Sequence, residues 1–271
     1  RVDRKAPVVV ITVPASGSYL RGGVTTVNAD VTDESATILD LNGVPGVSTG
    51  CVDLSGGDKR CSYTADIPIL AGNATIVATA FDEAGNRSVA QVSAVVDNTP
   101  PVITVSSPVA GRVTNATSIA AVGTVADTSP ITLTINGQTV ATGEGGSFST
   151  SVVTDAIGVA FSGIEGPRDL VFTATDAAGN ESSVTVAVVF DRTPPVLTIA
   201  SPLQGAVIPA STVAVSGTVQ DATQVSVSVQ GSSAMVTGLA YSAPLSGLSE
   251  GAFTISVRAV DAAGNETTLT R

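Results

Sequence analysis

Hydrophobic and polar residues alternate along most of this chain in short runs that end at Gly, Pro, Asn or Asp. Residues 102–106 place Ile103 and Val105 on one face of an extended segment. Residues 196–200 repeat the pattern with Leu197 and Ile199. A period of two is typical of a β-strand with one buried face, and the turn-forming residues mark its ends. The pattern predicts many short strands and no long helix.

The pattern recurs along the chain at a step of about 94 residues, which indicates an internal repeat. A turn of sequence Asp-x-Ala-Gly-Asn occurs at residues 82–86, 176–180 and 261–265. Other residues recur in register, namely Pro7, Pro101 and Pro195, then Pro14, Pro108 and Pro202, then Asp33, Asp127 and Asp221. The third copy is shorter, and its loss falls between Asp221 and Asp261.

A unit of this length with short alternating strands has the size of one immunoglobulin-like sandwich. The sequence therefore predicts an all-β fold, with three tandem immunoglobulin-like antiparallel β-sandwich domains in a rod. The expected boundaries are 1–97, 98–191 and 192–271. Strand A is expected at residues 8–13, 102–106 and 196–200, and strand B near Val31, Val125 and Val219. Strands F and G of the second copy are expected at 170–175 and 184–190.

Turn chemistry supports this assignment in the second copy. Asn136-Gly137 separates two strand-like runs, 131–135 and 139–141. A two-residue hairpin turn of type I′ needs positive φ at both central residues, which Asn and Gly tolerate best. Residues 143–146 are expected to form a turn between strands. Phe172 and Phe190 fall in strand registers that predict burial.

The two ends of the sequence resemble interrupted strands. Val2-Asp3 matches Val96-Asp97 and Phe190-Asp191, which close a G strand. Residues 266–271 match only the first half of a G strand. A strand that stops midway leaves a sheet edge open. The expectation is that the array continues on both sides, with strand donation by a neighbouring subunit as the alternative.

Composition and charge narrow the function classes. The net charge is −11, which disfavours nucleic acid and anionic membranes as partners. No run of apolar residues approaches the length of a membrane-spanning helix. The chain has no His, which excludes Ser/His/Asp and Cys/His catalytic sites. Acidic residues sit mostly in turns, with no element left over to build a cleft. The chain is therefore not expected to be an enzyme.

Cys51 and Cys61 are the two cysteines, and they lie in a stretch that looks rich in loops. With no His and no other Cys they cannot form a four-ligand zinc site. The favoured interpretation is a short disulfide formed in an oxidising compartment, with two free thiols as the alternative. This interpretation places the protein outside the cell or at its surface.

At the family level, each copy opens with Asp-x-Thr-Pro-Pro or its variant Lys5-Ala6-Pro7 and ends with Asp-x-Ala-Gly-Asn. This combination resembles bacterial Ig-like repeat domains of surface adhesins and of accessory regions in secreted polysaccharide-degrading enzymes. The resemblance covers essentially the whole chain. It implies the sandwich fold and an extracellular setting, and it says little about function.

Acidic residues recur at three points that an Ig-like sandwich brings to one pole: the start of strand A, the B–C loop and the F–G loop. The residues are Asp3, Asp33, Asp82 and Asn86 in the first copy, Asp97, Asp127, Asp176 and Asn180 in the second, and Asp191, Asp221, Asp261 and Asn265 in the third. Ca²⁺ takes six to eight oxygen ligands from carboxylates and carbonyls. The sequence thus predicts a calcium site at each pole.

A competing interpretation needs no metal, because Asp and Asn are ordinary turn formers that bond their own backbone. In that case Asp82 simply opens a hairpin, with Gly85 and Asn86 at positive φ. The sequence alone leaves both interpretations open.

The predicted role is architectural: an extracellular spacer or stalk segment of a bacterial surface repeat protein. Paired prolines in the linkers favour short, stiff joints. The expected partners are neighbouring copies of the array or subunits, and a surface glycan or protein. Two alternatives stay open, a subunit or sheath of an extracellular filament and an accessory carbohydrate-binding region of a secreted hydrolase. Sparse aromatics, 3% of residues with no Trp, argue against the last.

Overall fold

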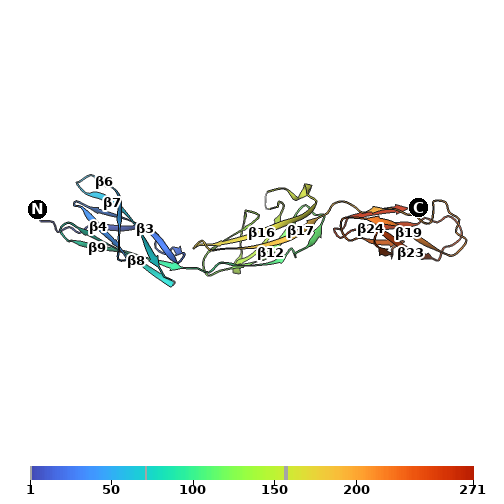
Figure 1. Cartoon of the computed structure of the whole chain (residues 1–271), viewed down its shortest axis with the longest axis horizontal. Helices are drawn as coiled ribbons and strands as arrows, with labels where there is room; N and C mark the ends of the chain where they lie inside the picture. The colour runs from blue at the N-terminus through green and yellow to red at the C-terminus, as the bar shows by residue number, and fades with distance from the viewer. Residues whose placement is uncertain (1, 71, 156–157) are drawn as a thin grey trace.

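The computed structural model describes residues 2–70, 72–155 and 158–271. These residues form six β-sheets that pack in pairs as three sandwiches. Figure 1 shows the three sandwiches lying end to end, with the termini at opposite ends of the molecule. The all-β fold of tandem immunoglobulin-like sandwiches expected from the sequence is confirmed.

The first sandwich packs a four-stranded sheet, β1-β3-β7-β6, against a five-stranded sheet, β2-β9-β8-β4-β5. Val27 and Ile67 from the first sheet and Leu41 and Ile76 from the second are fully buried between them. The strands are β1 (Val8–Val13), β2 (Tyr19–Leu20), β3 (Gly23–Asp33), β4 (Thr37–Leu41), β5 (Val44–Pro45), β6 (Val47–Asp53), β7 (Lys59–Ile69), β8 (Gly72–Asp82) and β9 (Arg87–Val96).

The second sandwich packs a three-stranded sheet, β10-β12-β15, against a five-stranded sheet, β11-β17-β16-β13-β14. Its core is the most aromatic, with Phe148 and Phe172 facing each other across the two sheets at 5.9 Å between ring centroids. Its elements are β10 (Val102–Ser107), β11 (Arg112–Thr114), β12 (Ile119–Ala126), β13 (Ile131–Ile135), β14 (Gln138–Val140), η1 (Glu144–Gly146), β15 (Ser147–Val152), η2 (Phe161–Gly163), β16 (Gly166–Asp176) and β17 (Glu181–Phe190).

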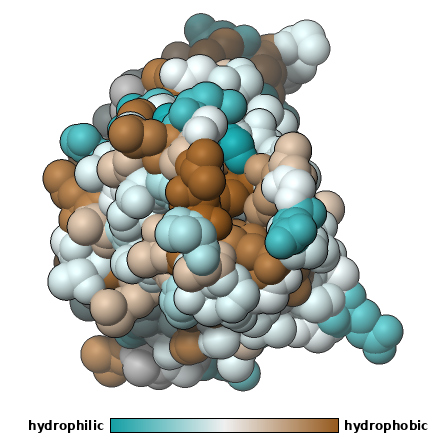
Figure 2. Space-filling view, turned by 90° about the vertical axis from the view of Figure 1, so that its right-hand side faces the viewer, coloured by the Kyte–Doolittle hydropathy of each residue, from teal (hydrophilic) through white to brown (hydrophobic). Residues whose placement is uncertain are grey.

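The third sandwich packs two four-stranded sheets, β18-β19-β23-β22 and β21-β20-β24-β25. Tyr241 is its largest fully buried side chain. The strands are β18 (Val196–Leu197), β19 (Thr212–Gln220), β20 (Ser226–Val229), β21 (Ser232–Ser233), β22 (Met235–Thr237), β23 (Ala240–Ser246), β24 (Ser256–Val260) and β25 (Glu266–Thr270). Figure 2 looks onto this end of the molecule and shows hydrophobic surface gathered near the middle of the face.

Most strand predictions agree with the structure. The hairpin between β13 and β14 turns at Asn136 and Gly137, with φ of 51° and 76°. Phe172 and Phe190 are 0% and 1% exposed. Strand A of the third copy is shorter than the predicted 196–200. There the amide of Thr218 bonds the side-chain Oγ1 of Thr198 at 3.0 Å, and Tyr241 Oη donates to the Thr198 carbonyl, so the regular ladder ends.

Candidate metal centres at the sandwich poles

Each sandwich brings three aspartates together at its N-terminal pole. In each set, every aspartate has one carboxylate oxygen that lies within 4.8 Å of a carboxylate oxygen of the other two. The sets are Asp3, Asp33 and Asp82; Asp97, Asp127 and Asp176; and Asp191, Asp221 and Asp261. The members of a set come from the segment before strand A, from the B–C turn and from the end of strand F. The juxtaposition predicted from the repeat is therefore present in all three copies.

The F–G turn that supplies the third carboxylate is built the same way each time. In the second copy Asp176 Oδ1 accepts from the amide of Asn180 at 2.7 Å, and Gly179 N donates to the Asp176 carbonyl at 3.2 Å. Gly179 has φ of 86°, a backbone conformation that residues other than Gly rarely adopt. In the first copy Gly85 takes this conformation, and Asn86 does not. The expectation of positive φ at Asn86 was wrong, because one left-handed residue suffices to close the turn.

The asparagine of this turn joins the pole to the segment that enters the sandwich. Its Nδ2 donates to the aspartate Oδ2 of the same turn at 2.7 Å in every copy. It also donates to the backbone carbonyl of the entering aspartate, at 3.4 Å from Asn86 to Asp3, 2.9 Å from Asn180 to Asp97 and 2.8 Å from Asn265 to Asp191. Both N–H groups of the side-chain amide thus donate within the protein. Oδ1 is the atom of this side chain that could ligate a cation.

The Oδ1 atoms of Asn180 and Asn265 differ in their surroundings. Asn265 Oδ1 accepts from Asn115 Nδ2 of the preceding sandwich at 3.0 Å. Asn180 is 0% exposed, and its Oδ1 has no hydrogen-bond partner among the described residues. These side chains were predicted as metal ligands alongside the aspartates. Their Nδ2 atoms tie the turn to the entering chain, and ligation of a metal through Oδ1 stays a prediction.

Hydroxyl and amide donors hold the remaining carboxylates in place. In the second copy Asp127 Oδ1 accepts from both the amide and the hydroxyl of Ser129, at 2.8 and 2.9 Å. In the third, the hydroxyl of Thr223 lies 2.8 Å from Asp191 Oδ2 and 3.0 Å from Asp221 Oδ1. These bonds fix the carboxylates close together, although like charges at such distances repel.

Two of these aspartates have lowered pKa values. The backbone amide of Thr99 lowers the pKa of Asp97, burial opposes this, and bonds to Ser129 and Thr128 add to the lowering. Burial alone would raise the pKa of Asp82. Bonds from the side chain and backbone of Asn86 outweigh it, so the net shift is downward. Both groups therefore keep their charge to lower pH than a free carboxyl.

The first copy contains a polar atom that the protein itself does not satisfy. Asp33 is 1% exposed, and its Oδ1 accepts from the amide and hydroxyl of Ser35. Its Oδ2 is buried without a hydrogen-bond partner among the described residues. A buried carboxylate oxygen without a donor is costly, and a bound cation removes that cost. Carboxylate and carbonyl oxygens form a hard donor set that suits Ca²⁺ better than a softer metal.

The cysteines form the expected disulfide, Cys51–Cys61, although not in a loop as predicted. They lie directly opposite each other on β6 and β7, in one antiparallel hairpin. All seven residues of β6 are exposed, so this strand reads from the sequence as loop. The bond ties the exposed edge strand β6 to the core strand β7.

At the two joints between sandwiches, the residue after the entering aspartate anchors the linker to the preceding sandwich, although it was not singled out from the sequence. At the second joint Arg192 donates to the carbonyls of Ile164 and Ala116, and its amide bonds both carboxylate oxygens of Glu165 at 3.0 and 3.1 Å. Its guanidinium lies 5.2 Å from the ring centroid of Phe190. The sequence offered one indication of this role: the position is Arg192 at the second joint and Asn98 at the first, so the two copies differ there.

At the first joint the anchor is much smaller. Asn98 Oδ1 accepts one bond, from the amide of Gly22 at 2.7 Å. The loop that supplies Ile164 and Glu165 to the second joint also carries Phe161, which is fully buried and stacks 4.4 Å from Phe190. This loop lies in the part of the second copy that the third copy lacks. The two joints therefore share the asparagine tie and differ in the anchor on the preceding sandwich.

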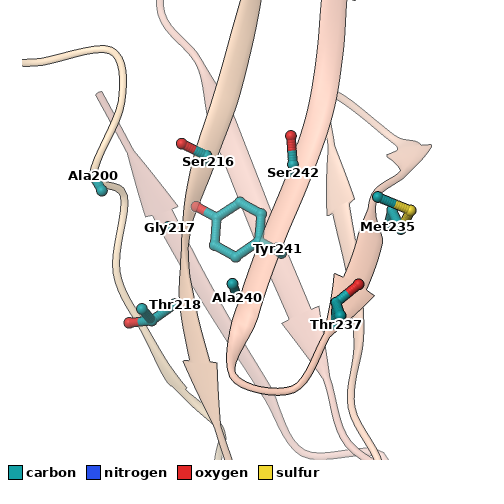
Figure 3. A pocket seen from close by; sticks show the side chains of 9 residues that line it. All are labelled: Ala200, Ser216, Gly217, Thr218, Met235, Thr237, Ala240, Tyr241 and Ser242. Carbon is teal, nitrogen blue, oxygen red and sulfur yellow. The ribbon is translucent and has the colours of Figure 1, made fainter.

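A groove of about 400 Å³ lies on the third sandwich over β19, β22 and β23. Figure 3 shows Tyr241 in the middle of the residues that line it. The Tyr241 side chain is only 2% exposed, and its hydroxyl donates to Thr198 O at 2.8 Å. A sugar ring stacks on an exposed aromatic face, and this ring presents none. The groove does not provide the aromatic platform typical of carbohydrate-binding sandwiches.

Comparison with known proteins identifies the domain type. The family model of glucodextranase, domain B, matches residues 101–192 and again residues 195–271. The chain belongs to the glucodextranase domain B family. The two matched segments of this domain B chain carry the second and third sandwiches, and the first copy with its disulfide lies outside them. No curated protein matches the chain.

Several solved structures are similar to this domain B chain. The fibronectin(III)-like modules of Clostridium thermocellum CbhA match with a TM-score of 0.41 and 16% identity, over 68% of this chain and 94% of that one. Titin domains I67–I69, in an E-to-A mutated variant, match with a TM-score of 0.39 and 11% identity over 98% of both chains. Protocadherin gammaB7 EC3-6 matches with a TM-score of 0.28 and 16% identity, over 98% and 76%. Among the residues that the structure describes, no helix is long and apolar enough to cross a bilayer.

Proposed function

We propose that this chain is a non-catalytic extracellular spacer, in which three sandwiches hold neighbouring parts of a larger protein at a fixed distance. The observation that carries the proposal is the linker held from both sides. At the second joint Asn265 bonds the carbonyl of Asp191 from the following sandwich, while Arg192 bonds the preceding one. A linker fixed at both ends transmits orientation as well as distance, which suits a spacer and serves no purpose in a flexible tether.

The extracellular setting rests on the disulfide. The bond joins Cys51 on the exposed edge strand β6 to Cys61 on β7. Such bonds persist in oxidising compartments. The expected partners are adjoining domains of the same array, and an acidic surface of net charge −11 keeps such an array soluble.

Calcium is the proposed cofactor of the three poles. The support is the set of three carboxylates within 4.8 Å, together with the unsatisfied Oδ2 of the buried Asp33. Asp33, Asp82 and Asp3 would hold the ion in the first copy, and the equivalent triads in the others. The bound ion would neutralise the repulsion among the carboxylates and stiffen each pole against the chain that enters it.

The family name favours one setting over the surface adhesin anticipated from the sequence. A chain that belongs to the glucodextranase domain B family fits an accessory region of a secreted hydrolase. In that setting the sandwiches would space a catalytic domain from its neighbours. Binding of carbohydrate in the groove of the third sandwich is not favoured, because the buried ring of Tyr241 offers no stacking face there.

The test is thermal unfolding and small-angle X-ray scattering of the full chain, with calcium and with EGTA. At a hundredfold excess over Kd a ligand that binds only the folded state stabilises by about 2.7 kcal/mol. The calcium effect should shrink in Asp127→Ala and Asp221→Ala and persist in Asp169→Ala, an exposed control on β16. A compact or broadly distributed shape in both conditions contradicts the spacer. An extended shape without any calcium effect removes only the cofactor.

A further inference from the structure

In the first two sandwiches, the strand that follows strand A pairs in parallel with the last strand. β2 pairs with the end of β9, Tyr19 opposite Val95 and Leu20 opposite Val96. β11 pairs in the same way with the end of β17, from Arg112 opposite Val188 to Thr114 opposite Phe190. We call these two contacts the parallel clamps. Each joins the segment by which the chain enters a sandwich to the strand by which it leaves.

Backbone hydrogen bonds run along the clamp of the first sandwich. Gly17 N donates to Ser93 O at 2.7 Å, and Val95 N donates to Ser18 O at 2.9 Å. The series ends with Asp97 N, which donates to Leu20 O at 2.9 Å. The clamp of the second sandwich is bounded by Gly111 N to Ala187 O at 2.8 Å and Asp191 N to Thr114 O at 3.0 Å. Each series therefore reaches the first residue of the joint.

The direction of pull on a chain held at both ends decides how these bonds are loaded. The entering strand is drawn towards the N-terminal pole, and the leaving strand is drawn towards the C-terminal pole. Because the two strands are parallel, they can separate only by sliding past each other along their length. The bonds of a parallel ladder are evenly spaced along it and share a sliding load, whereas a peeled hairpin loses its bonds one at a time.

We propose that the first two sandwiches bear tension, so that the chain works as a load-bearing tether as well as a spacer. The clamp must break before strand G can leave the sheet, because G lies between the clamp strand and β8 or β16. The joint continues the same path. Asp97 is bonded to the first sandwich through its amide and to the second through its carbonyl, which accepts from Asn180.

Single-molecule force spectroscopy of the full chain, pulled from its two ends, tests the proposal. The first sandwich can be identified by its disulfide, which spans ten positions in sequence. Reducing it should lengthen that unfolding step by about 35 Å, at roughly 3.5 Å per residue. This marked sandwich should open at clearly higher force in the unmodified chain than in a variant whose clamp is broken.

A pair of variants separates the clamp from ordinary stability. Val95→Pro removes the amide that donates to Ser18 O. Ile76→Val removes a buried methylene from the core away from the clamp. Urea midpoints of both variants measure how much each change lowers ordinary stability. At a fixed force, Val95→Pro should unfold about five times faster than Ile76→Val, as expected for the loss of one net hydrogen bond.

Two results would overturn the proposal. One is an unfolding force of the first sandwich in the unmodified chain that is no higher than that of a peeled hairpin, a measurement that does not depend on any variant folding. The other is a loss of force in Val95→Pro no larger than in an equally destabilised Ile76→Val. Neither result bears on the spacer, which is judged by shape in solution, so the two proposals fail separately.

Discussion

Asn180 Nδ2 lies 2.9 Å from the carbonyl oxygen of Asp97 and donates a hydrogen bond to it across the first joint. The same nitrogen donates to Asp176 Oδ2 at 2.7 Å, so one side chain holds both the F–G turn and the entering chain. The equivalent contact recurs from Asn265 to Asp191 at 2.8 Å. The Asp-x-Ala-Gly-Asn motif is therefore a joint-forming element as well as a turn.

Replacing Asn180 with alanine should destabilise the second sandwich. The change leaves the carbonyl of Asp97 and one oxygen of Asp176 without their donor in a site where Asn180 itself is 0% exposed. A buried group left unpaired costs about 1–3 kcal/mol. Calorimetry of the full chain in EGTA should show the loss in one transition. Gln138→Ala, at an exposed position on β14 of the same sandwich, is the control and should be neutral.

The two joints should differ in stiffness. Arg192 spans the carbonyls of Ile164 and Ala116, whereas Asn98 takes one bond at the first joint. Spin labels on exposed residues of adjoining sandwiches should therefore give a narrower distance distribution across the second joint than across the first. Arg192→Ala should broaden the second to resemble the first, and Asn98→Ala should change the first little.

Arg192→Lys serves as the control for charge at this joint. Lysine keeps the positive charge but cannot reach several acceptors at once with a planar guanidinium, so it should restore little of the stiffness. Equal widths at the two joints in the unmodified chain would contradict the assignment of Arg192 as the anchor.

The strands and the poles could be predicted because they depend on local rules. Alternation defines strands such as β10, and Asn136-Gly137 specifies its own turn. The anchor of Arg192 could not be found this way, since Glu165 lies 27 residues earlier in the chain and meets it only through the fold. The strand β6 was taken for a loop because it is an edge with no buried face, so no alternation marks it.

Acid should weaken the poles. The pKa values of Asp82 and Asp97 are lowered in the folded chain. Their contribution to stability is therefore fully present above the unfolded value of about 3.9 and is lost as the pH falls through the lowered folded values. Urea midpoints of protein freed of calcium beforehand and kept in calcium-free buffer should fall as the pH drops below about 4.

The variant Asp97→Asn isolates one of these groups. Asparagine cannot titrate, so its urea midpoint should be lower at neutral pH and should fall less steeply with acid than that of the unmodified chain. Asp169→Asn, at an exposed position on β16, should leave the acid dependence unchanged. A midpoint that falls equally in all three proteins would show that the lowered pKa of Asp97 contributes nothing.

Close backbone approach should make two glycines irreplaceable. A Cβ on Gly217 would lie 2.0 Å from Thr198 O and 2.8 Å from Tyr241 Oη, and a Cβ on Gly123 would lie 2.2 Å from Thr104 O. Neither glycine has positive φ, so the constraint is space and not backbone conformation. At this point strand A runs beside strand B, and an aromatic residue, Phe148 or Tyr241, stands opposite the glycine on the other neighbouring strand.

Gly217→Ala should therefore force strand A away from β19 and destabilise the third sandwich by about 1–3 kcal/mol or more, as overpacking does. The bond from Tyr241 to Thr198 O should be lost with it, which hydrogen exchange at residues 198–200 would detect as faster exchange. Gly163→Ala is the matched control, since a Cβ there meets no atom within 4 Å and φ is not positive. If Gly217→Ala proved as stable as Gly163→Ala, strand A would be able to move away from β19 without loss of stability. The close approach of Thr198 to Gly217 would then contribute nothing to the stability of this sandwich.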